Sequence, residues 1–353
     1  MSKSQSTILI VTQKVDRNDD VLGFFHGWIQ EFSKHYEKVT VICLEKGEVS
    51  LPSNVAVFSL GKERASKSRF IYAGRFIWQA WRSRRDYKYV FVHMNSEYLL
   101  LAGLMWRLFS KKIALWYNHT YGTFATRVSF HLAHGLFHTS PYAFSADLAH
   151  SIRMPAGIDT DQFKPSLSVA REENTVLYIG RIAPIKRVDV LIKAVDLLGK
   201  EDIKKIIHIY GEAIHKDFAY EERVKKEARP LLRSKQIFFH GKIPNSKTPE
   251  IYQRHSLFVN LTPRGNYDKT VLEAAASGMV VIASSEAFAD FLPKELRFKE
   301  GDSFDLAEKI RSISLIPKHA RDMLASTLRE YAVSNHDTKL LASRVAEFFK
   351  KDV

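Results

Sequence analysis

The chain has a single cysteine, Cys43, among its 353 residues. One cysteine cannot form an intramolecular disulfide or a multi-cysteine metal site, which indicates a reducing compartment. Long apolar runs are also missing. The longest, YLLLAGLMW before Arg107, is about half of the roughly 20 residues that span a bilayer, and the early run TILIVT is too short for a signal peptide. We expect a cytoplasmic protein, at most peripheral to a membrane.

Glycine and proline number 16 and 11, with no repeat period, which excludes collagen-like and solenoid architectures. Acidic residues are the minority among charged residues: 53 Lys and Arg stand against 39 Asp and Glu, a net charge of +14. The charge is +8 before Pro165 and +6 from it onward, so no basic tail explains it. The balance favours partners that carry phosphate, namely nucleic acid, anionic lipid or nucleotide ligands.

What the sequence does contain is an alternation of short β-branched runs with longer segments of helical periodicity. This pattern predicts an α/β fold with two doubly wound, Rossmann-like domains built on parallel sheets. We expect an N-terminal domain over residues 1–165, a C-terminal domain over 166–335 and a final helix over 336–353 that packs back towards the N-terminal domain. The Pro- and Gly-containing segment 154–174 is interpreted as the linker. The predicted strands are ILIVT, VTVICL, VAVFSL, YVFVHM, IALWYN, TVLYIG, IIHIYG, QIFFHGKI, LFVNLT and VVIAS.

Two basic residues follow the first strand of the second half. Arg181 lies at the end of TVLYIG, after Gly180, and Lys186 lies just before the next helix. A guanidinium fork and an ammonium point charge suit the two phosphates of a diphosphate. The alternative is that both are solvated loop charges.

A second polar segment, PRGNYDKTVLE, joins the strand LFVNLT to a helix. Asp268 can cap this helix, and the free backbone N–H groups of Lys269, Thr270 and Val271 would form an anion site at its N-terminus. Glu273, one turn in, could accept hydrogen bonds from ribose hydroxyls, or it could simply complement the helix dipole. Near Gly241, backbone groups that include Ile243 could contact a nucleotide base.

Taken together, GR-x4-K and the later D-K-x-x-x-E-A-x-A-x-G resemble the retaining glycosyltransferases of family 4, which have the GT-B fold. The resemblance covers residues 174–286 and extends weakly to the segment from Gly157 to Pro165. It implies two Rossmann-like domains that face a central cleft, and transfer of a sugar from a nucleotide-diphosphate donor with retention and without a metal or other cofactor. By the same resemblance, Arg181 and Lys186 grip the donor diphosphate and Glu273 holds the ribose.

One position departs from the family pattern. The first Glu of the E-x7-E motif, which contacts the transferred sugar, is replaced by Gly265. Its role could pass to Asn266 and Tyr267 or to Asp268, the donor sugar could be unusual, or the chain could be an inactive homologue.

The first half resembles the family poorly, and the resemblance assigns it the acceptor. Asp20 in the first loop is a candidate acceptor contact or a helix cap. Two histidines follow strands: His93 is a weaker acceptor candidate, and His119 resembles the family histidine that binds the donor sugar near the reacting centre. Either could instead be a satisfied polar residue of the fold. No HxxxH or HExxH pattern lies near carboxylates in a zinc-like arrangement, so we predict no metal site.

Residues 61–85 hold eight basic residues and one acidic residue, Glu63. Phe70, Ile77, Trp78 and Trp81 fall at helical spacing. Such a helix can lie in an anionic membrane surface, or its apolar stripe can belong to the core of an ordinary Rossmann domain. The resemblance favours a membrane, since many relatives modify lipid-linked acceptors in polysaccharide biosynthesis.

We therefore expect a hexosyltransferase that acts on a glycan or lipid-linked acceptor. Two alternatives remain: a GT-B enzyme of different chemistry, such as a nucleotide-sugar epimerase, and an inactive nucleotide- or nucleic-acid-binding protein. The sequence shows no nucleic-acid module, so no specific nucleic-acid partner is expected.

Overall fold

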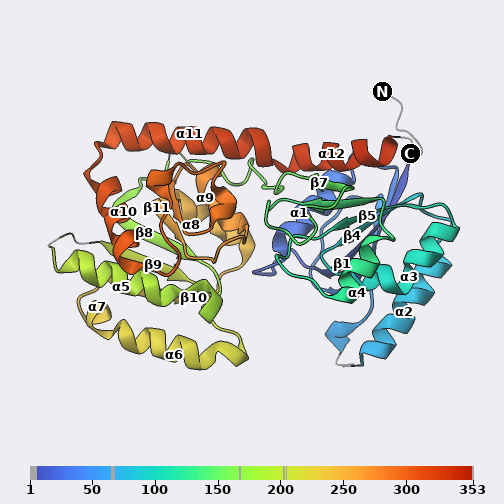
Figure 1. Cartoon of the computed structure of the whole chain (residues 1–353), viewed down its shortest axis with the longest axis horizontal. Coiled ribbons are helices and arrows are strands. Elements are labelled where there is room, and N and C mark those ends of the chain that lie inside the picture. The colour runs from blue at the N-terminus through green and yellow to red at the C-terminus, as the bar shows by residue number, and fades with distance from the viewer. Residues whose placement is uncertain (1–5, 65–67, 167, 202, 204, 352–353) are drawn as a thin grey trace. The chain divides into compact units, whose positions relative to one another are not determined.

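The computed structural model describes residues 6–64, 68–166, 168–201, 203 and 205–351, and the chain divides into two compact units (Figure 1). Unit 1 comprises Met1–Gly157 and Thr338–Val353, and unit 2 comprises Ile158–Asp337. The boundary precedes the expected one at 165/166 because the chain joins unit 2 directly after Gly157. There the N–H of Ile158 donates to the carbonyl of His336 at 2.7 Å, and Phe163 is buried. The segment interpreted as a linker is thus partly a packed element of unit 2.

Unit 1 is a seven-stranded parallel sheet in the order β3-β2-β1-β4-β5-β6-β7. Its central strands are almost entirely buried, as expected for a sheet with helices on both faces. The strands are β1 (Thr7–Val15), β2 (Lys38–Lys46), β3 (Val55–Ser59), β4 (Tyr89–His93), β5 (Lys112–Trp116), β6 (Gly135–His138) and β7 (Ser151–Arg153).

Two separate hydrophobic clusters cover the two faces of this sheet. One holds residues of α1 and α12, among them Trp28, Leu341 and Phe349. The other holds residues of α2, α3 and α4, among them Phe76 and Trp106. The helices are α1 (Gly23–Phe32), α2 (Arg69–Arg82), α3 (Glu97–Leu108), α4 (Phe124–Phe130) and α12 (Thr338–Lys350).

Unit 2 is a five-stranded parallel sheet in the order β10-β9-β8-β11-β12. The order changes direction at β8, the position at which doubly wound sheets bind ligands beyond the carboxyl ends of their strands. The strands are β8 (Glu172–Ile179), β9 (Ile206–Tyr210), β10 (Ile237–Gly241), β11 (His255–Asn260) and β12 (Val280–Ala283). The helices are α5 (Val188–Gly199), α6 (Phe218–Glu227), α7 (Arg229–Arg233), α8 (Thr248–Arg254), α9 (Lys269–Ala276), α10 (Ser303–Leu315) and α11 (Lys318–His336).

All ten predicted strands are present, and the α/β fold class is confirmed. Two further strands, β6 and β7, extend the sheet of unit 1 and were not predicted, because four and three residues are too few to show a period. None of the helices in the described part of the chain combines the length and the apolar character needed to cross a bilayer.

Candidate functional site

Three glycines mark the carboxyl edge of the sheet in unit 2, where β8, β9 and β10 end. Gly211 has φ +132°, and a Cβ added to it would lie 1.9 Å from the carbonyl oxygen of Gly180. Gly211 in turn donates its N–H to the carbonyl of Gly241 at 2.7 Å. Only glycine permits this approach of neighbouring backbones, so the edge exposes peptide groups rather than side chains.

The two predicted diphosphate ligands lie close in sequence but differ in environment. Arg181 follows β8 and is exposed, and its guanidinium makes no hydrogen bond or ion pair with the residues that the structure describes. Lys186 lies in the short turn before α5, and its Nζ is 2.5 Å from Oδ2 of Asp268. The structure therefore brings Lys186 and Asp268 together from the ends of β8 and β11.

Asp268 precedes α9, but its side chain does not cap that helix, contrary to the sequence prediction. Its carboxylate instead accepts hydrogen bonds from Lys186, from Asn260 Nδ2 at 3.1 Å and from the Thr262 hydroxyl. Burial would raise the pKa of Asp268, but the charge of Lys186 and these donors outweigh it and hold the pKa below its ordinary value. Three donors from outside the helix, one of them charged, are stronger partners than a single helix amide.

The first turn of α9 offers fewer free amides than predicted. The N–H of Val271 donates to the carbonyl of Asp268 at 3.2 Å, so it is not free. The hydroxyl of Thr270 is buried and has no hydrogen-bond partner among the residues that the structure describes. The expectation of three free amides over Lys269, Thr270 and Val271 is therefore wrong for Val271.

Glu273 lies one turn into α9 and is 4% exposed. Its Oε2 accepts a hydrogen bond from the hydroxyl of fully buried Tyr252 at 3.1 Å. Burial raises the pKa of Glu273 above its ordinary value, against the opposing charge of Lys269, and burial likewise lowers the pKa of Lys269. The hydrogen bond from Tyr252 fixes the orientation of the Glu273 carboxylate.

The departure at Gly265 has a backbone cause. Gly265 has φ +87° within a turn in which the N–H of Asn266 donates to the carbonyl of Pro263. A glutamate at this position would be strained, because residues with a Cβ avoid this conformation. The ring of Tyr267 is buried against Phe288, and its hydroxyl lies 3.2 Å from Nε2 of His336.

A cavity of about 350 Å³ opens beside Gly211 and Gly241, beyond β9 and β10. Residues of the glycine edge and of α6 line it, with Phe218, Phe239 and Glu221 among them. Ile243, the predicted base contact, is half-buried and does not line this cavity.

The three candidates of unit 1 have different surroundings. His93 ends β4, is 4% exposed, and stacks on Phe25 at 4.2 Å. His119 follows β5 and is half-buried between the rings of Tyr117 and Tyr121, and burial lowers its pKa. Asp20 is half-buried in the turn before α1. Ring stacking and a 3.2 Å contact between Nδ1 of His93 and the hydroxyl of Thr12 account for the position of His93. The roles assigned to all three stay predictions.

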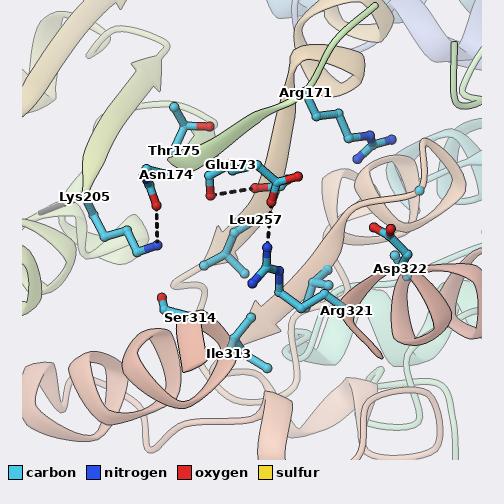
Figure 2. Close-up of a pocket in the computed structure, with 14 residues that line it drawn as sticks. Arg171, Glu173, Asn174, Thr175, Lys205, Leu257, Ile313, Ser314, Arg321 and Asp322 are labelled. Atoms are coloured by element: carbon cyan, nitrogen blue, oxygen red, sulfur yellow. Dashed lines mark hydrogen bonds and ion pairs between the residues drawn. The ribbon is translucent and has the colours of Figure 1, made fainter. Parts of the chain in front are cut away.

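Another pocket lies at the opposite, amino-terminal end of the sheet in unit 2 (Figure 2). Two basic side chains of this pocket already have protein partners. Nη2 of Arg321 lies 2.7 Å from Oε2 of Glu173, and Nζ of Lys205 lies 3.4 Å from Oδ1 of Asn174. With about 80 Å³ it is far smaller than ligand pockets usually are. Close to this end, the described residues contain one group that could hold a metal ion: Glu172, His208 and His255.

Sequence reasoning missed three residues of the site, namely Asn260, Thr262 and Tyr252. Asn260 and Thr262 are polar residues at the carboxyl end of a buried strand, a signal that could have placed them beside Asp268. No local pattern links Tyr252 to Glu273, because the contact depends on how α8 packs against α9.

Comparison with known proteins shows what the chain is similar to. Residues 159–328 match the family described as "Glycosyl transferases group 1". Mannosylfructose-phosphate synthase of Agrobacterium fabrum is 25% identical over 147 residues, which cover 38% of this chain and 32% of that protein. Sulfoquinovosyl transferase SQD2 of Arabidopsis thaliana is 24% identical over 206 residues, covering 53% and 38%. The matches thus span about a third of the length of these relatives.

Among solved structures, HepE of Anabaena in complex with UDP and glucose superimposes with a TM-score of 0.76 at 16% identity, covering 98% of this chain and 99% of that one. At this identity the likeness establishes the fold. The family match extends over nearly all of unit 2 and includes Arg181, Lys186, Asp268 and Glu273. The chain therefore has the fold of the GT-B glycosyltransferases, and within it residues 159–328 of unit 2 are similar to the family described as "Glycosyl transferases group 1".

Proposed function

We propose that this chain is a retaining hexosyltransferase that takes its sugar from a nucleotide-diphosphate donor held by unit 2. The observation that carries the proposal is the group of Lys186, Asp268, Asn260 and Thr262 at the carboxyl ends of β8 and β11. Together with exposed Arg181, it places positive charge where doubly wound sheets bind ligands. The complex of the GT-B neighbour HepE with UDP supports a donor of this class.

In this proposal Arg181 and Lys186 act on the leaving group. The nucleotide diphosphate gains negative charge as the bond to the sugar breaks, and preorganised cations aimed at that charge stabilise the transition state. Two cations in place of a metal would make the reaction metal-independent. Binding of the donor requires Lys186 to exchange its contact with Asp268 for one with phosphate, or to share it.

Glu273 is proposed to accept hydrogen bonds from the ribose. Its carboxylate is held by Tyr252 Oη, so only its remaining lone pairs are available to a ligand. Because Gly265 has no side chain, contacts to the sugar would come from peptide groups of the turn and from Asn266.

The acceptor is proposed to be a glycan or a lipid-linked glycan in polysaccharide biosynthesis, bound by unit 1 on the cytoplasmic side of a membrane. Asp20 and His93 are the acceptor candidates of unit 1.

His119 is proposed to hydrogen-bond the donor sugar near the reacting centre. Burial lowers the pKa of His119, so its imidazole is neutral at physiological pH and available for such a hydrogen bond.

The surface of α2 supports membrane binding. The apolar stripe of this helix is exposed and is not part of the core: Phe70 is 90% exposed and Trp78 57%. Phe76 and Ala80, on another side of the helix, are the residues that pack inside. The structure thus excludes the core alternative for the stripe. Residues 65–67 of the basic segment lie outside the described residues.

Helix α3 lies beside α2 (Figure 1). The exposed leucines of α3 add a second apolar stripe. Trp81 of α2 contacts Phe109, just after α3, with ring centroids 5.6 Å apart. We name this surface the α2–α3 apolar face; its members are Phe70, Ile71, Ile77, Trp78, Trp81, Leu100, Leu101, Leu104, Leu108 and Phe109.

Basic side chains surround this face. The guanidinium of Arg84 lies 4.1 Å from the ring centroid of Trp81, and that of Arg82 lies 5.0 Å from Trp78. Exposed arginines beside exposed tryptophan and leucine match an anionic bilayer surface in both charge and polarity. We propose that the α2–α3 apolar face docks on such a surface.

A thermal-shift titration tests the donor. UDP, GDP, ADP and TDP are added to EDTA-treated protein and then again with Mg²⁺. Nucleotide at 100 times its dissociation constant should stabilise the chain by about 2.7 kcal/mol. A shift with one nucleotide in EDTA is expected. No shift with any of them would overturn the donor proposal and favour an inactive homologue.

Flotation with vesicles tests the membrane. Binding to vesicles that contain anionic lipid is expected, with loss of binding as salt is raised. Failure to float at low salt would end the membrane proposal and leave the donor proposal intact.

A further inference from the structure

Two histidines and a glutamate lie together at the amino-terminal end of the sheet in unit 2, away from the proposed donor-binding residues. Glu172 is the first residue of β8, His255 is the first residue of β11, and His208 lies within β9. One ligand atom from each lies within 4.8 Å of the other two, and Nε2 of His208 is 4.0 Å from Oε2 of Glu172. The ring centroids of His208 and His255 are 4.7 Å apart.

A bulge brings these three residues together. His255 pairs with Glu172, but two residues later Leu257 pairs with Val176, so β8 carries extra residues between these positions. Within the bulge the hydroxyl of Thr175 donates to the carbonyl of Glu172 at 2.7 Å. Bulges re-aim side chains next to sites, and this one turns Glu172 towards the imidazoles.

An outer contact fixes how the imidazole of His255 is protonated. Thr175, labelled in Figure 2, uses its only hydroxyl proton on Glu172, so its 3.0 Å contact with Nδ1 of His255 requires an Nδ1–H donor. That leaves Nε2 of His255 with a free lone pair. His208 also has a polar partner at its second ring nitrogen, because its Nδ1 lies 2.8 Å from Nε2 of His240. Orienting contacts at the second ring nitrogen are characteristic of histidines that bind metals.

We propose that Glu172, His208 and His255 bind one Zn²⁺ ion. Two imidazole nitrogens and a carboxylate oxygen are a ligand set that zinc takes, with water in the fourth position. Ligands at about 2.1 Å from the metal lie about 3.4 Å from one another. Glu172 is 54% exposed and can close the remaining distance by rotating its side chain.

The ion would link β8, β9 and β11 at the amino-terminal end of the sheet. Arg181, Lys186 and Asp268 lie beyond the carboxyl ends of the strands. The zinc site is therefore structural in this proposal and has no part in the transfer reaction, so it stands apart from the proposed function.

The experiment is a calorimetric Zn²⁺ titration of the full chain after treatment with EDTA and desalting. One equivalent should bind, and binding should raise the melting temperature. His208→Ala and Glu172→Gln should lose the site, while His240→Ala should weaken it about 10- to 100-fold. His319→Ala, an exposed histidine of α11, is the matched control and should bind as the wild type does.

Two outcomes would overturn the proposal: no saturable binding in the wild type, or equal affinity in the wild type and His208→Ala. Far-UV circular dichroism shows whether each variant is folded, and Glu172→Gln removes an exposed side chain if His208→Ala is not. Cobalt(II) gives a second readout, since its visible bands should appear with the wild type and disappear with His208→Ala. UDP binding in EDTA, measured in parallel, reports on the donor site alone.

Discussion

Replacing Arg181 and replacing Lys186 should have different effects on the stability of the chain. Arg181 is exposed, so Arg181→Ala should leave the free energy of unfolding nearly unchanged. Its turnover should fall about 10²–10³-fold, because one donor to the developing charge is lost. Thermal unfolding and steady-state turnover with the nucleotide sugar check both parts. A variant that unfolds would contradict the assignment.

Lys186→Ala should lose turnover and stability together. It removes the cation that pairs with the carboxylate of Asp268, which costs about 1–3 kcal/mol. The double variant Lys186→Ala with Asp268→Asn should recover most of that stability while turnover stays low. Additive losses of stability in a double-mutant cycle would show that the two residues do not interact.

Glu273 predicts a pH dependence of stability. Burial raises its pKa above the ordinary value of 4.5 on folding, so above pH 4.5 the folded chain keeps a proton that the unfolded chain has lost. The stabilisation is complete below pH 4.5 and is lost as the pH rises through the folded-state pKa. In Glu273→Gln the free energy of unfolding should fall less over this pH range, by about 1–3 kcal/mol. Urea unfolding at several pH values measures the difference.

Exposed Glu222→Gln is the control for that series and should follow the wild type. An unchanged slope in Glu273→Gln would show that Glu273 is ionised throughout. At alkaline pH the opposite trend is expected from Lys269, because burial lowers its pKa and it therefore gains a proton when the chain unfolds.

At the scale of helices and strands, the α2–α3 apolar face gives the next prediction. Leu104 and Leu108 are 69% and 84% exposed, so Leu104→Ser with Leu108→Ser should not affect folding. Each leucine buried in a bilayer contributes about 1.5–3 kcal/mol, so the vesicle partition coefficient should fall at least about 10-fold. Flotation measures it.

The matched control uses two exposed apolar residues of unit 2. Leu315 and Met323 are 75% and 69% exposed, and their replacement by serine should leave vesicle binding as it is. If both pairs had the same effect, binding would not depend on the α2–α3 apolar face.

The same helices show how far sequence reasoning reaches. Periodicity placed α2 and its apolar stripe, but it could not say which side of the helix faces the sheet, because Phe76 and Ala80 form a second apolar side. In α9 the pattern located Asp268 and Glu273 correctly at the start of the helix. It could not foresee that Lys186 would draw the carboxylate of Asp268 away from capping, since that contact joins residues 82 positions apart. Strand order and long-range partners are decided by packing, which local patterns do not record.

At the scale of the whole molecule, the two units have separate cores and should unfold in two transitions. UDP is expected to raise the transition of unit 2. Leu341→Ala, at a fully buried position of α12, should lower the free energy of unfolding of unit 1 by about 2–5 kcal/mol, and with it the temperature of that transition. Differential scanning calorimetry separates the two, and a single transition that moves with both perturbations would contradict independent cores.

The chain enters unit 2 at Ile158 and leaves it at Asp337, and these two residues form a β-bridge. Helix α12, which completes one hydrophobic cluster of unit 1, therefore follows all of unit 2 in sequence. On the ribosome, unit 2 can reach its native state while Trp28 and its neighbours still lack Leu341 and Phe349. The order in which the two units begin and the order in which they are completed are thus inverted: the domain begun first is finished last.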